Sequence, residues 1–238
     1  MQLLLPDASL RSPTAVPGRS DIRDENIYSA IVLQHGGAGQ QQLFTVPRGQ
    51  AIPRLAGAGI TVPTSNHQVN YTELTTNIMQ SGQLGSSIGE ASVRAIGLNI
   101  ENAYVAGSQH GAATAGDLNT YGAGQQEINE ILGKCFFQFR VAGKLQNQGP
   151  AAFYPASGGA IGAISSTGNS VVASALSNGL PGSTRRLKAP ILIARTDTVE
   201  GTVGVAGGDA LVFSVTSGIG QPVLLWCNLF AAVKGDAR

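Results

Sequence analysis

The pentapeptide Gly85-Ser86-Ser87-Ile88-Gly89 matches the G-x-S-x-G pattern that carries the nucleophilic serine of many hydrolases. That serine needs a strand before it, a helix after it, and an acid and then a histidine later in the chain. Only His110 follows Ser87, with Glu90 and Glu101 between them, and no alternation of strands and helices frames the motif. We therefore interpret the pentapeptide as a turn, and we predict no catalytic residues and no enzyme activity.

The groups that could hold a metal ion do not have the spacing of a known site. Three histidines are spread along the chain: His35, His67 and His110. Zinc sites need three or four converging ligands, so ordinary loop histidines are favoured. Asp21, Asp24 and Glu25 could offer oxygens to a hard cation such as Ca²⁺, but the segment lacks the glycine and final glutamate of an EF-hand loop. We predict no metal and no cofactor, and a solvated or arm-docking role for this acidic group.

The charge balance argues against a protein that binds nucleic acid. The net charge is +1, whereas non-specific binding needs several clustered Lys and Arg side chains. The first 25 residues set three arginines against four acids: Arg11, Arg19 and Arg23 against Asp7, Asp21, Asp24 and Glu25. This segment is a neutral arm, and the chain has no phosphate-binding GxGxxG or GxxxxGK[ST] loop. We expect no sequence-specific nucleic-acid partner.

A basic cluster lies just before a predicted strand, at Arg185, Arg186 and Lys188. A contact between subunits and a contact with a phosphate both fit this cluster, and we favour the subunit contact. The arginines of the N-terminal segment, Arg11, Arg19 and Arg23, are further interface candidates.

The composition indicates a surface that is covered by other molecules. Charged residues make up only 12% of the chain, about half the usual share, and there are 32 glycines. A monomer with so few charges is poorly protected against association. Coverage by neighbouring copies explains this best, and a glycine- and alanine-rich secreted β-protein is the alternative. The chain shows no secretion signal and no apolar run near the length of a membrane span, so we expect it to remain in, or assemble in, a cytoplasm.

Alternating apolar residues predict a chain made mainly of strands. The predicted strands span residues 27–34, 43–46, 94–100, 136–141, 187–194, 199–205, 210–216 and 223–233. The loop 35–39 joins the first two in a hairpin-like arrangement. Pro47, Pro53 and Pro63 restrict the next stretch to edges, bends and loops. Cys135 and Cys227 lie in apolar strands and are predicted to be buried, reduced thiols.

Helix is predicted at one segment with a clear pattern. From Gln125 to Leu132 apolar residues recur with helical spacing, and Gly133 follows where a C-terminal cap belongs. Its carboxylates, Glu127 and Glu130, are expected to be solvated, because acid–base work would need a cleft that separates their pKa values. A second helical pattern runs from Thr72 to Gln80. The whole predicts an all-β sandwich or jelly roll at residues 26–238, after an extended N-terminal arm at residues 1–25.

Three blocks of sequence, in order between residues 72 and 195, resemble the jelly-roll capsid proteins of tailless icosahedral bacteriophages. The first block joins Thr76-Asn77-Ile78, Ser81-Gly82-Gln83-Leu84 and Arg94-Ala95-Ile96-Gly97-Leu98. The second joins Phe137-Gln138-Phe139-Arg140-Val141-Ala142-Gly143-Lys144, Gly149-Pro150 and Tyr154-Pro155-Ala156-Ser157-Gly158-Gly159. The third joins Gly179-Leu180-Pro181 and Leu187-Lys188-Ala189-Pro190-Ile191-Leu192-Ile193. Many such capsid proteins are longer and stack two jelly rolls, whereas this chain holds strands for one.

The resemblance implies a jelly-roll β-sandwich whose work is assembly. It implies a homo-oligomer, a trimer or larger capsomer, that contacts other capsid proteins in a virion assembled in the host cytoplasm. Because such phages often enclose a membrane, it also implies an inner lipid layer as a further partner. The alternative is a β-sandwich binding module, such as a phage decoration, receptor-binding or carbohydrate-binding domain. The large aromatic residues that could be core or interface anchors are Phe153, Tyr154, Trp226 and Phe230.

Overall fold

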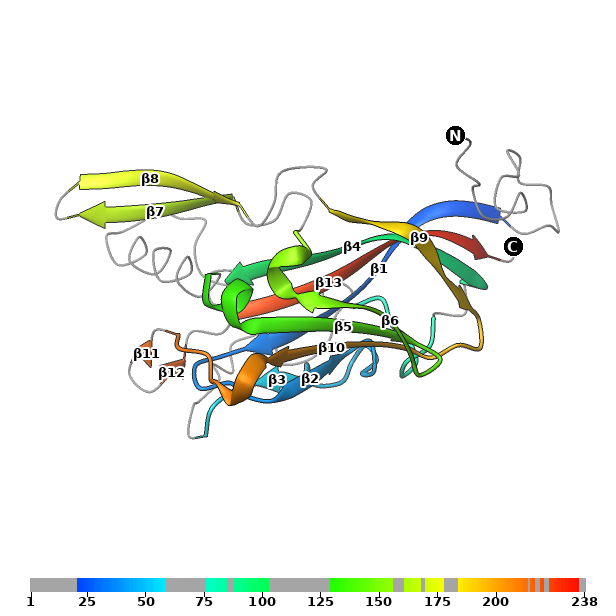
Figure 1. Cartoon of the computed structure of the whole chain (residues 1–238), viewed down its shortest axis with the longest axis horizontal. Coiled ribbons are helices and arrows are strands. Elements are labelled where there is room, and N and C mark those ends of the chain that lie inside the picture. The colour runs from blue at the N-terminus through cyan, green and yellow to red at the C-terminus, as the bar shows by residue number, and fades with distance from the viewer. Residues whose placement is uncertain are drawn as a thin grey trace.

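The computed structural model describes residues 21–58, 76–84, 88–102, 129–155, 161–167, 170–177, 184–213, 215–216, 219–220 and 223–235. These residues form two main β-sheets that lie over one another, with a helical segment at residues 129–134 (Figure 1). The predicted all-β class is confirmed. Among the described residues, no helix is long and apolar enough to cross a membrane.

One main sheet has five strands in the order β3, β1, β13, β4, β9. Their bounds are Arg54–Leu55 for β3, Asp21–Leu33 for β1, Val223–Gly235 for β13, Glu90–Asn102 for β4 and Arg185–Ala194 for β9. All neighbours are antiparallel except β1 and β3, which are parallel. The central strand β13 is paired along both of its edges, with β1 and with β4.

The other main sheet has four antiparallel strands in the order β2, β10, β5, β6. Their bounds are Gln40–Leu43 for β2, Val199–Val205 for β10, Cys135–Val141 for β5 and Lys144–Pro150 for β6. Two short 3₁₀ turns, η3 (Ala151–Phe153) and η4 (Ala206–Gly208), follow β6 and β10.

Two small antiparallel hairpins lie outside the main sheets. The hairpin of β7 (Ile161–Thr167) and β8 (Ser170–Ser177) lies between β6 and β9 in the sequence, and it projects beyond the end of the sandwich (Figure 1). The second hairpin, β11 (Val215–Thr216) and β12 (Ile219–Gly220), lies between β10 and β13.

The core lies between the two main sheets and is built by simple alternation. In β5 every second residue is buried, and Phe137 and Phe139 are fully covered. Edge-to-face contacts join the Phe139 ring to Phe44, with 6.5 Å between ring centroids, and the Phe137 ring to Tyr154, at 5.0 Å. Each fully buried side chain of this size stabilises the fold by about 1.5–3 kcal/mol. The sandwich is therefore held mainly by inward-facing residues of strands that are distant in sequence.

The structure corrects several expected elements. The first two predicted strands do not form a hairpin: β1 belongs to the five-stranded sheet and β2 to the four-stranded sheet. Of the predicted helix at 72–80, residues 76–79 have no regular structure, and residues 72–75 lie outside the described part. β1 begins at Asp21, so the last five residues of the predicted arm are part of a strand, while residues 1–20 lie outside the described part.

Two further differences concern the predicted helix and the strand at 210–216. The helix is present at residues 129–134, so it continues through Gly133, which therefore does not cap it; residues 125–128 lie outside the described part. Leu211 and Phe213 are buried as their alternation predicted, but residues 209–213 form no strand. Leu211 instead exchanges backbone hydrogen bonds with the loop after β1, its N–H to Gly37 O and its carbonyl from Gly36 N–H. In this segment the alternation of apolar residues correctly predicted which side chains are buried, although the segment does not pair as a strand.

The loop after β1 offers a test of this packing at Gly37. A methyl group on Gly37 would lie 2.5 Å from the carbonyl oxygen of Leu55, a backbone atom that cannot rotate away. We predict that Gly37→Ala lowers the free energy of unfolding by about 1–3 kcal/mol. Urea unfolding followed by circular dichroism measures this.

The matched control is Gly133→Ala in the helix, where the added methyl meets no atom within 4 Å. That change is expected to stabilise the protein by about 0.5–1 kcal/mol, because alanine favours helix over glycine. Equal effects of the two substitutions would contradict the close approach of the loop to β3.

Candidate interaction surfaces

The structure separates the three residues of the predicted basic cluster. The guanidinium carbon of Arg185 lies 4.9 Å from the centre of the Tyr154 ring and 5.9 Å from that of Phe153. Such cation–π contacts are favourable, and they hold Arg185 against its own chain. Arg186 and Lys188 are exposed. An interface role for the cluster stays a prediction that applies best to the two exposed residues.

The ring that Arg185 covers belongs to the core. Tyr154 is fully buried, and its hydroxyl donates a 2.6 Å hydrogen bond to Asn147 Oδ1. Burial raises the pKa of Tyr154, and the charge of Arg185 opposes part of that rise. Phe153, the neighbouring residue, is 59% exposed. Of the two adjacent aromatics, Tyr154 is therefore a core residue, and Phe153 is available to a partner.

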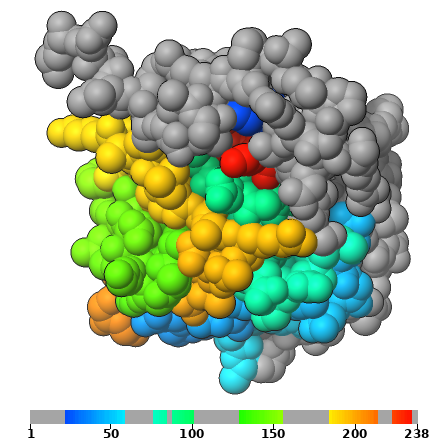
Figure 2. Space-filling model, turned by 90° about the vertical axis from the view of Figure 1, so that its right-hand side faces the viewer, coloured from blue at the N-terminus to red at the C-terminus, as the bar shows by residue number. Residues whose placement is uncertain are grey.

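Lys188 lies where β9 departs from its neighbour. The register of β4 with β9 shifts between Val93 and Ala95, and residues 187–190 of β9 have no paired residue on β4. Figure 2 views this end of the molecule, where β9 and the turn after it (yellow to orange) cross the surface beside the green β5–β6 segment. A bulge with exposed basic residues and Pro190 interrupts this edge of the sheet.

The remaining predicted interface residues lie in or near the N-terminal segment. Arg11 and Arg19 lie outside the described residues. Arg23 forms a 2.8 Å ion pair with Glu25 on the same face of β1. Exposed pairs of this kind contribute at most about 1 kcal/mol. Arg23 is therefore engaged within its own strand.

The described residues contain no group of three or more His, Cys, Asp and Glu side chains that could hold a metal ion. In β1, successive side chains alternate between faces, so Asp24 points away from the face of Glu25. Asp24 and Glu25 therefore lie on opposite faces of β1 and do not converge on one site. His35 Nδ1 lies 2.6 Å from the carbonyl oxygen of Phe213, so the ring donates to that carbonyl and ties residues 209–213 to the loop. His67 and His110 lie outside the described part.

The pentapeptide at 85–89 does not have the surroundings of a nucleophile elbow. Residues 85–87 lie outside the described part, but Gly89 leads directly into β4, and its N–H donates to Lys234 O at 2.7 Å. A hydrolase elbow needs a helix at that point, and here a strand follows.

Both cysteines are buried and free, as predicted. Burial raises the pKa of Cys135 to about 12, with a smaller contribution from the negative charge of Glu130. Burial also raises the pKa of Cys227. Thiolates are the reactive form, so burial makes both side chains weak nucleophiles near neutral pH.

We predict that both thiols of the native protein resist Ellman's reagent at mildly alkaline pH. With a pKa of about 12, only about one Cys135 in 10⁴ is a thiolate at pH 8. The same protein in guanidinium chloride is the control and should react fully with two equivalents. Rapid labelling of either thiol in the native protein would contradict their burial.

Glu130 of the helix holds a neighbouring segment in place. Its Oε1 is 2.7 Å from Lys134 Nζ and accepts a 3.1 Å hydrogen bond from Val212 N–H, while Lys134 Nζ also donates to Ala210 O at 3.3 Å. Burial raises the pKa of Glu130, but the hydrogen bonds from Lys134 and Val212 lower it more, so the pKa lies below its ordinary value. Glu130 is thus a structural carboxylate, and Glu127 lies outside the described part.

A lowered folded-state pKa means that ionised Glu130 stabilises the fold above pH 4.5 and that this contribution is lost as the pH falls through the folded-state value. We predict that Glu130→Gln lowers the free energy of unfolding at neutral pH by up to about 1 kcal/mol. The difference from the unsubstituted protein should shrink as the pH is taken below 4.5.

Urea unfolding over this pH range measures the effect. Glu90→Gln is the control, because Glu90 is exposed and lies 4.0 Å from Lys234. A pH-independent loss in Glu130→Gln would show that packing, not charge, holds the segment.

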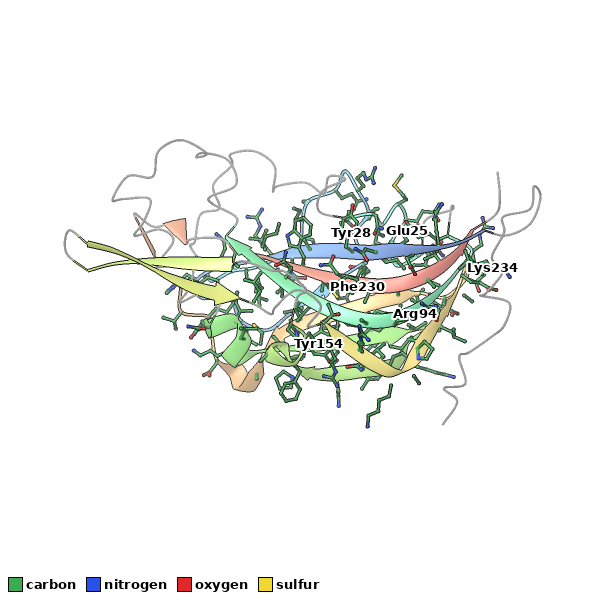
Figure 3. The ribbon with its side chains drawn as sticks, turned by 90° about the horizontal axis from the view of Figure 1, so that it is seen from above. Glu25, Tyr28, Arg94, Tyr154, Phe230 and Lys234 are labelled. Carbon is green, nitrogen blue, oxygen red and sulfur yellow. The ribbon has the colours of Figure 1, made fainter. Side chains whose placement is uncertain are left out.

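The outer faces of the two main sheets differ in character. On the five-stranded sheet Ala30, Val32, Ile52 and Leu224 form a second buried apolar cluster, with Val46 and Trp226 against it. The Tyr28 and Trp226 rings stack, with centroids 6.3 Å apart. Figure 3 labels Tyr28 on β1 and Phe230 on the neighbouring β13. Trp226 and Phe230 are half-buried on this outer face, so they cover the sheet and do not enter the central core.

The outer face of the four-stranded sheet is polar and open. The register places Thr202 of β10 opposite both Gln42 of β2 and Gln138 of β5, and Gln138 opposite Gln148 of β6. These four side chains, three glutamine amides and one threonine hydroxyl, form one row across all four strands, about 14 Å long at the usual strand spacing. We call it the amide row. Gln42 and Gln148 are exposed, and Gln138 is half-buried.

A second row beside the amide row places an aromatic ring on the same face. Gly204 lies opposite Phe136 and Gln40. A methyl group on Gly204 would lie 2.5 Å from Phe136 Cζ and 3.0 Å from Gln40 Cγ, so both side chains lean over the glycine. The alternation within residues 136–141 puts Gln138 on the face opposite Phe137 and Phe139, but only the register across four strands brings the glutamines together.

Comparisons with protein-family models, with curated proteins and with solved structures found no match to this chain.

Proposed function

We propose that this chain is a jelly-roll structural subunit of a virus shell, of the kind built by tailless icosahedral bacteriophages. The observation that carries the proposal is the pairing order of eight strands, which are all the strands of the two main sheets except the two-residue β3. Counted along the chain, the first pairs with the last, the second with the seventh, the third with the sixth and the fourth with the fifth: β1 with β13, β2 with β10, β4 with β9, and β5 with β6.

Nested pairing of this kind is what a long hairpin gives when it winds around a barrel. The winding adds two pairs, β13 with β4 and β10 with β5, which divide the strands into two four-stranded groups. This order supports a jelly roll, an architecture that capsid, lectin and cupin domains share. Since the fold serves several functions, the assembly role needs support from the surfaces of the molecule.

The support for an assembly role is a contrast between the strand edges of the main sheets, which are protected against pairing, and those of the β7–β8 hairpin, which are not. Each edge of the main sheets carries a feature that discourages pairing with another chain. At β9 it is the bulge with Pro190, and at β6 it is Lys144 at one end and Pro150 at the other. β3 has two residues, and the Gln41 side chain of the short strand β2 donates to Arg54 O at 2.9 Å, which joins the two sheets there.

The projecting β7–β8 hairpin carries no such protection. β7 and β8 pair only with each other among the described strands, and residues 161–177 contain neither a charge nor a proline. The whole stretch from residue 145 to 184 has no charged residue. A lone two-stranded hairpin is only marginally stable in water, so contact with a further surface would stabilise it. We propose that the surface belongs to another copy in a trimer or larger capsomer.

The proposed subunit would work through packing against its own copies and against other capsid proteins in a virion assembled in a host cytoplasm. An inner lipid layer belongs to the proposal only through the resemblance to membrane-containing phages. The exposed basic residues Arg186 and Lys188 remain proposed contacts of this assembly.

We predict that the purified protein forms trimers or larger assemblies in light scattering, and that Ser165→Lys with Ala173→Lys lowers the mass toward that of a monomer. The two changes put a charge on each strand of the hairpin, which disfavours burial against a neighbour. Circular dichroism should show an unchanged fold.

The matched control adds the same two charges on the body of the molecule, as Gln50→Lys with Gln83→Lys, at exposed turn and loop positions. It should leave the mass unchanged. If the unsubstituted protein is a monomer at high concentration, self-assembly is refuted. If it assembles and the two lysines in the hairpin leave the mass of the assembly unchanged, only the role of the hairpin is refuted.

A further inference from the structure

We propose that the outer face of the four-stranded sheet, centred on the amide row, binds a neutral, hydroxyl-rich polysaccharide. The proposal concerns a surface separate from the β7–β8 hairpin, and it holds whether or not the protein assembles. Its starting point is the chemistry that the register places side by side on one flat face.

The amides of this face are available. In the part of the chain that the structure describes, no side-chain hydrogen bond occupies the amides of Gln40, Gln138 and Gln148. Gln42 donates to Glu200 Oε1 at 2.6 Å, which leaves its amide oxygen open. Each glutamine amide presents two donors and one acceptor. A partner must therefore offer donors and acceptors at close intervals, as sugar hydroxyl groups do.

The charges on this face do not favour an ionic ligand. Arg140 lies directly opposite Glu200 in the register, so a positive and a negative group lie together beside the amide row, on the side away from Phe136. Phosphate or nucleic acid would need a cluster of one sign. A neutral ligand meets no such requirement.

The aromatic ring supplies the apolar part of the site. Phe136 lies over Gly204 in the row next to the amides and is half-buried, so a flat partner can cover it. The combination of one aromatic ring with a line of amides matches a sugar, whose ring has an apolar face and a polar rim.

A second protein surface fits this face less well. Protein interfaces have an apolar core, whereas the apolar residues described on this face are split by the amide row: Phe136 with Pro150 opposite it on one side, and Leu145 opposite Arg140 on the other. A peptide could not extend the sheet from this side, because the backbone groups of β10 and β5 are already paired within it. The polysaccharide is therefore the partner that the face favours.

Affinity electrophoresis in native gels containing dextran, mannan or mixed-linkage β-glucan tests the proposal, with polygalacturonate as the acidic comparison. We expect at least one neutral polysaccharide to retard the protein, and we expect this to persist at about 0.5 M NaCl, because no ion pairs are involved. Gln138→Ala with Gln148→Ala should weaken binding by about tenfold or more. Phe136→Leu should weaken it as well.

Gln50→Ala is the matched control, and it should bind as the unsubstituted protein does. Gln50 is exposed, and it lies between Val46 and Ile52, which pack on the outer face of the other main sheet. Gln148→Ala alone, at the exposed end of the row, gives the same readout if the double variant is unstable. The proposal is overturned if no neutral polysaccharide retards the protein, if the double variant binds equally well, or if binding is limited to polygalacturonate and lost in salt. A fall in the mass of the double variant in light scattering would overturn it too, because the face would then be a contact between copies.

Discussion

The pairing of β13 with β1 on one edge and β4 on the other is the interaction on which the rest of the structure depends. It joins Asp21 to Gly235 and so brings the two ends of the described chain together. Both faces of β13 are then used. Cys227 and Leu229 point into the central core, while Leu224 and Trp226 pack into the second apolar cluster on the outer face. A strand buried on both sides makes the five-stranded sheet the rigid layer against which the four-stranded sheet is held.

This arrangement explains why the two outer faces differ. The five-stranded sheet needs apolar cover because its central strand carries large residues on both faces. The four-stranded sheet is built from strands that are apolar on one side only, such as β5, where buried and half-buried residues alternate without a break. Its outer face is therefore free to carry amides. The glycines of β10 divide in the same way: Gly201 makes room for Phe44 in the core, and Gly204 makes room for Phe136 outside.

Sequence patterns predicted strands well where one face is dry and the other wet. β10 has the bounds that its alternation predicted, and β5 differs by one residue. The same sequence patterns predicted the pairing of strands poorly, because strands that are adjacent in the sequence need not share a sheet, as β1 and β2 show. The first residues of β1 were missed because Arg23 and Glu25 break the apolar pattern, although they pair with Val233 and Ala231. The amide row was beyond sequence analysis, because its residues come from four strands between Gln42 and Thr202 whose register depends on the whole fold.

The few charges of the described chain act mostly within it. Arg23 pairs with Glu25, Glu130 with Lys134, and Arg185 stacks on Tyr154. Charges used in this way hold local structure and contribute little to a long-range field, in keeping with a net charge near zero. The recognition that we propose would then rely on short-range, directional groups. The described residues offer two kinds: the backbone edges of β7 and β8, and the glutamine amides of β2, β5 and β6. Both act only at contact, so a partner must match them in spacing and direction, and that requirement would supply specificity where charge cannot.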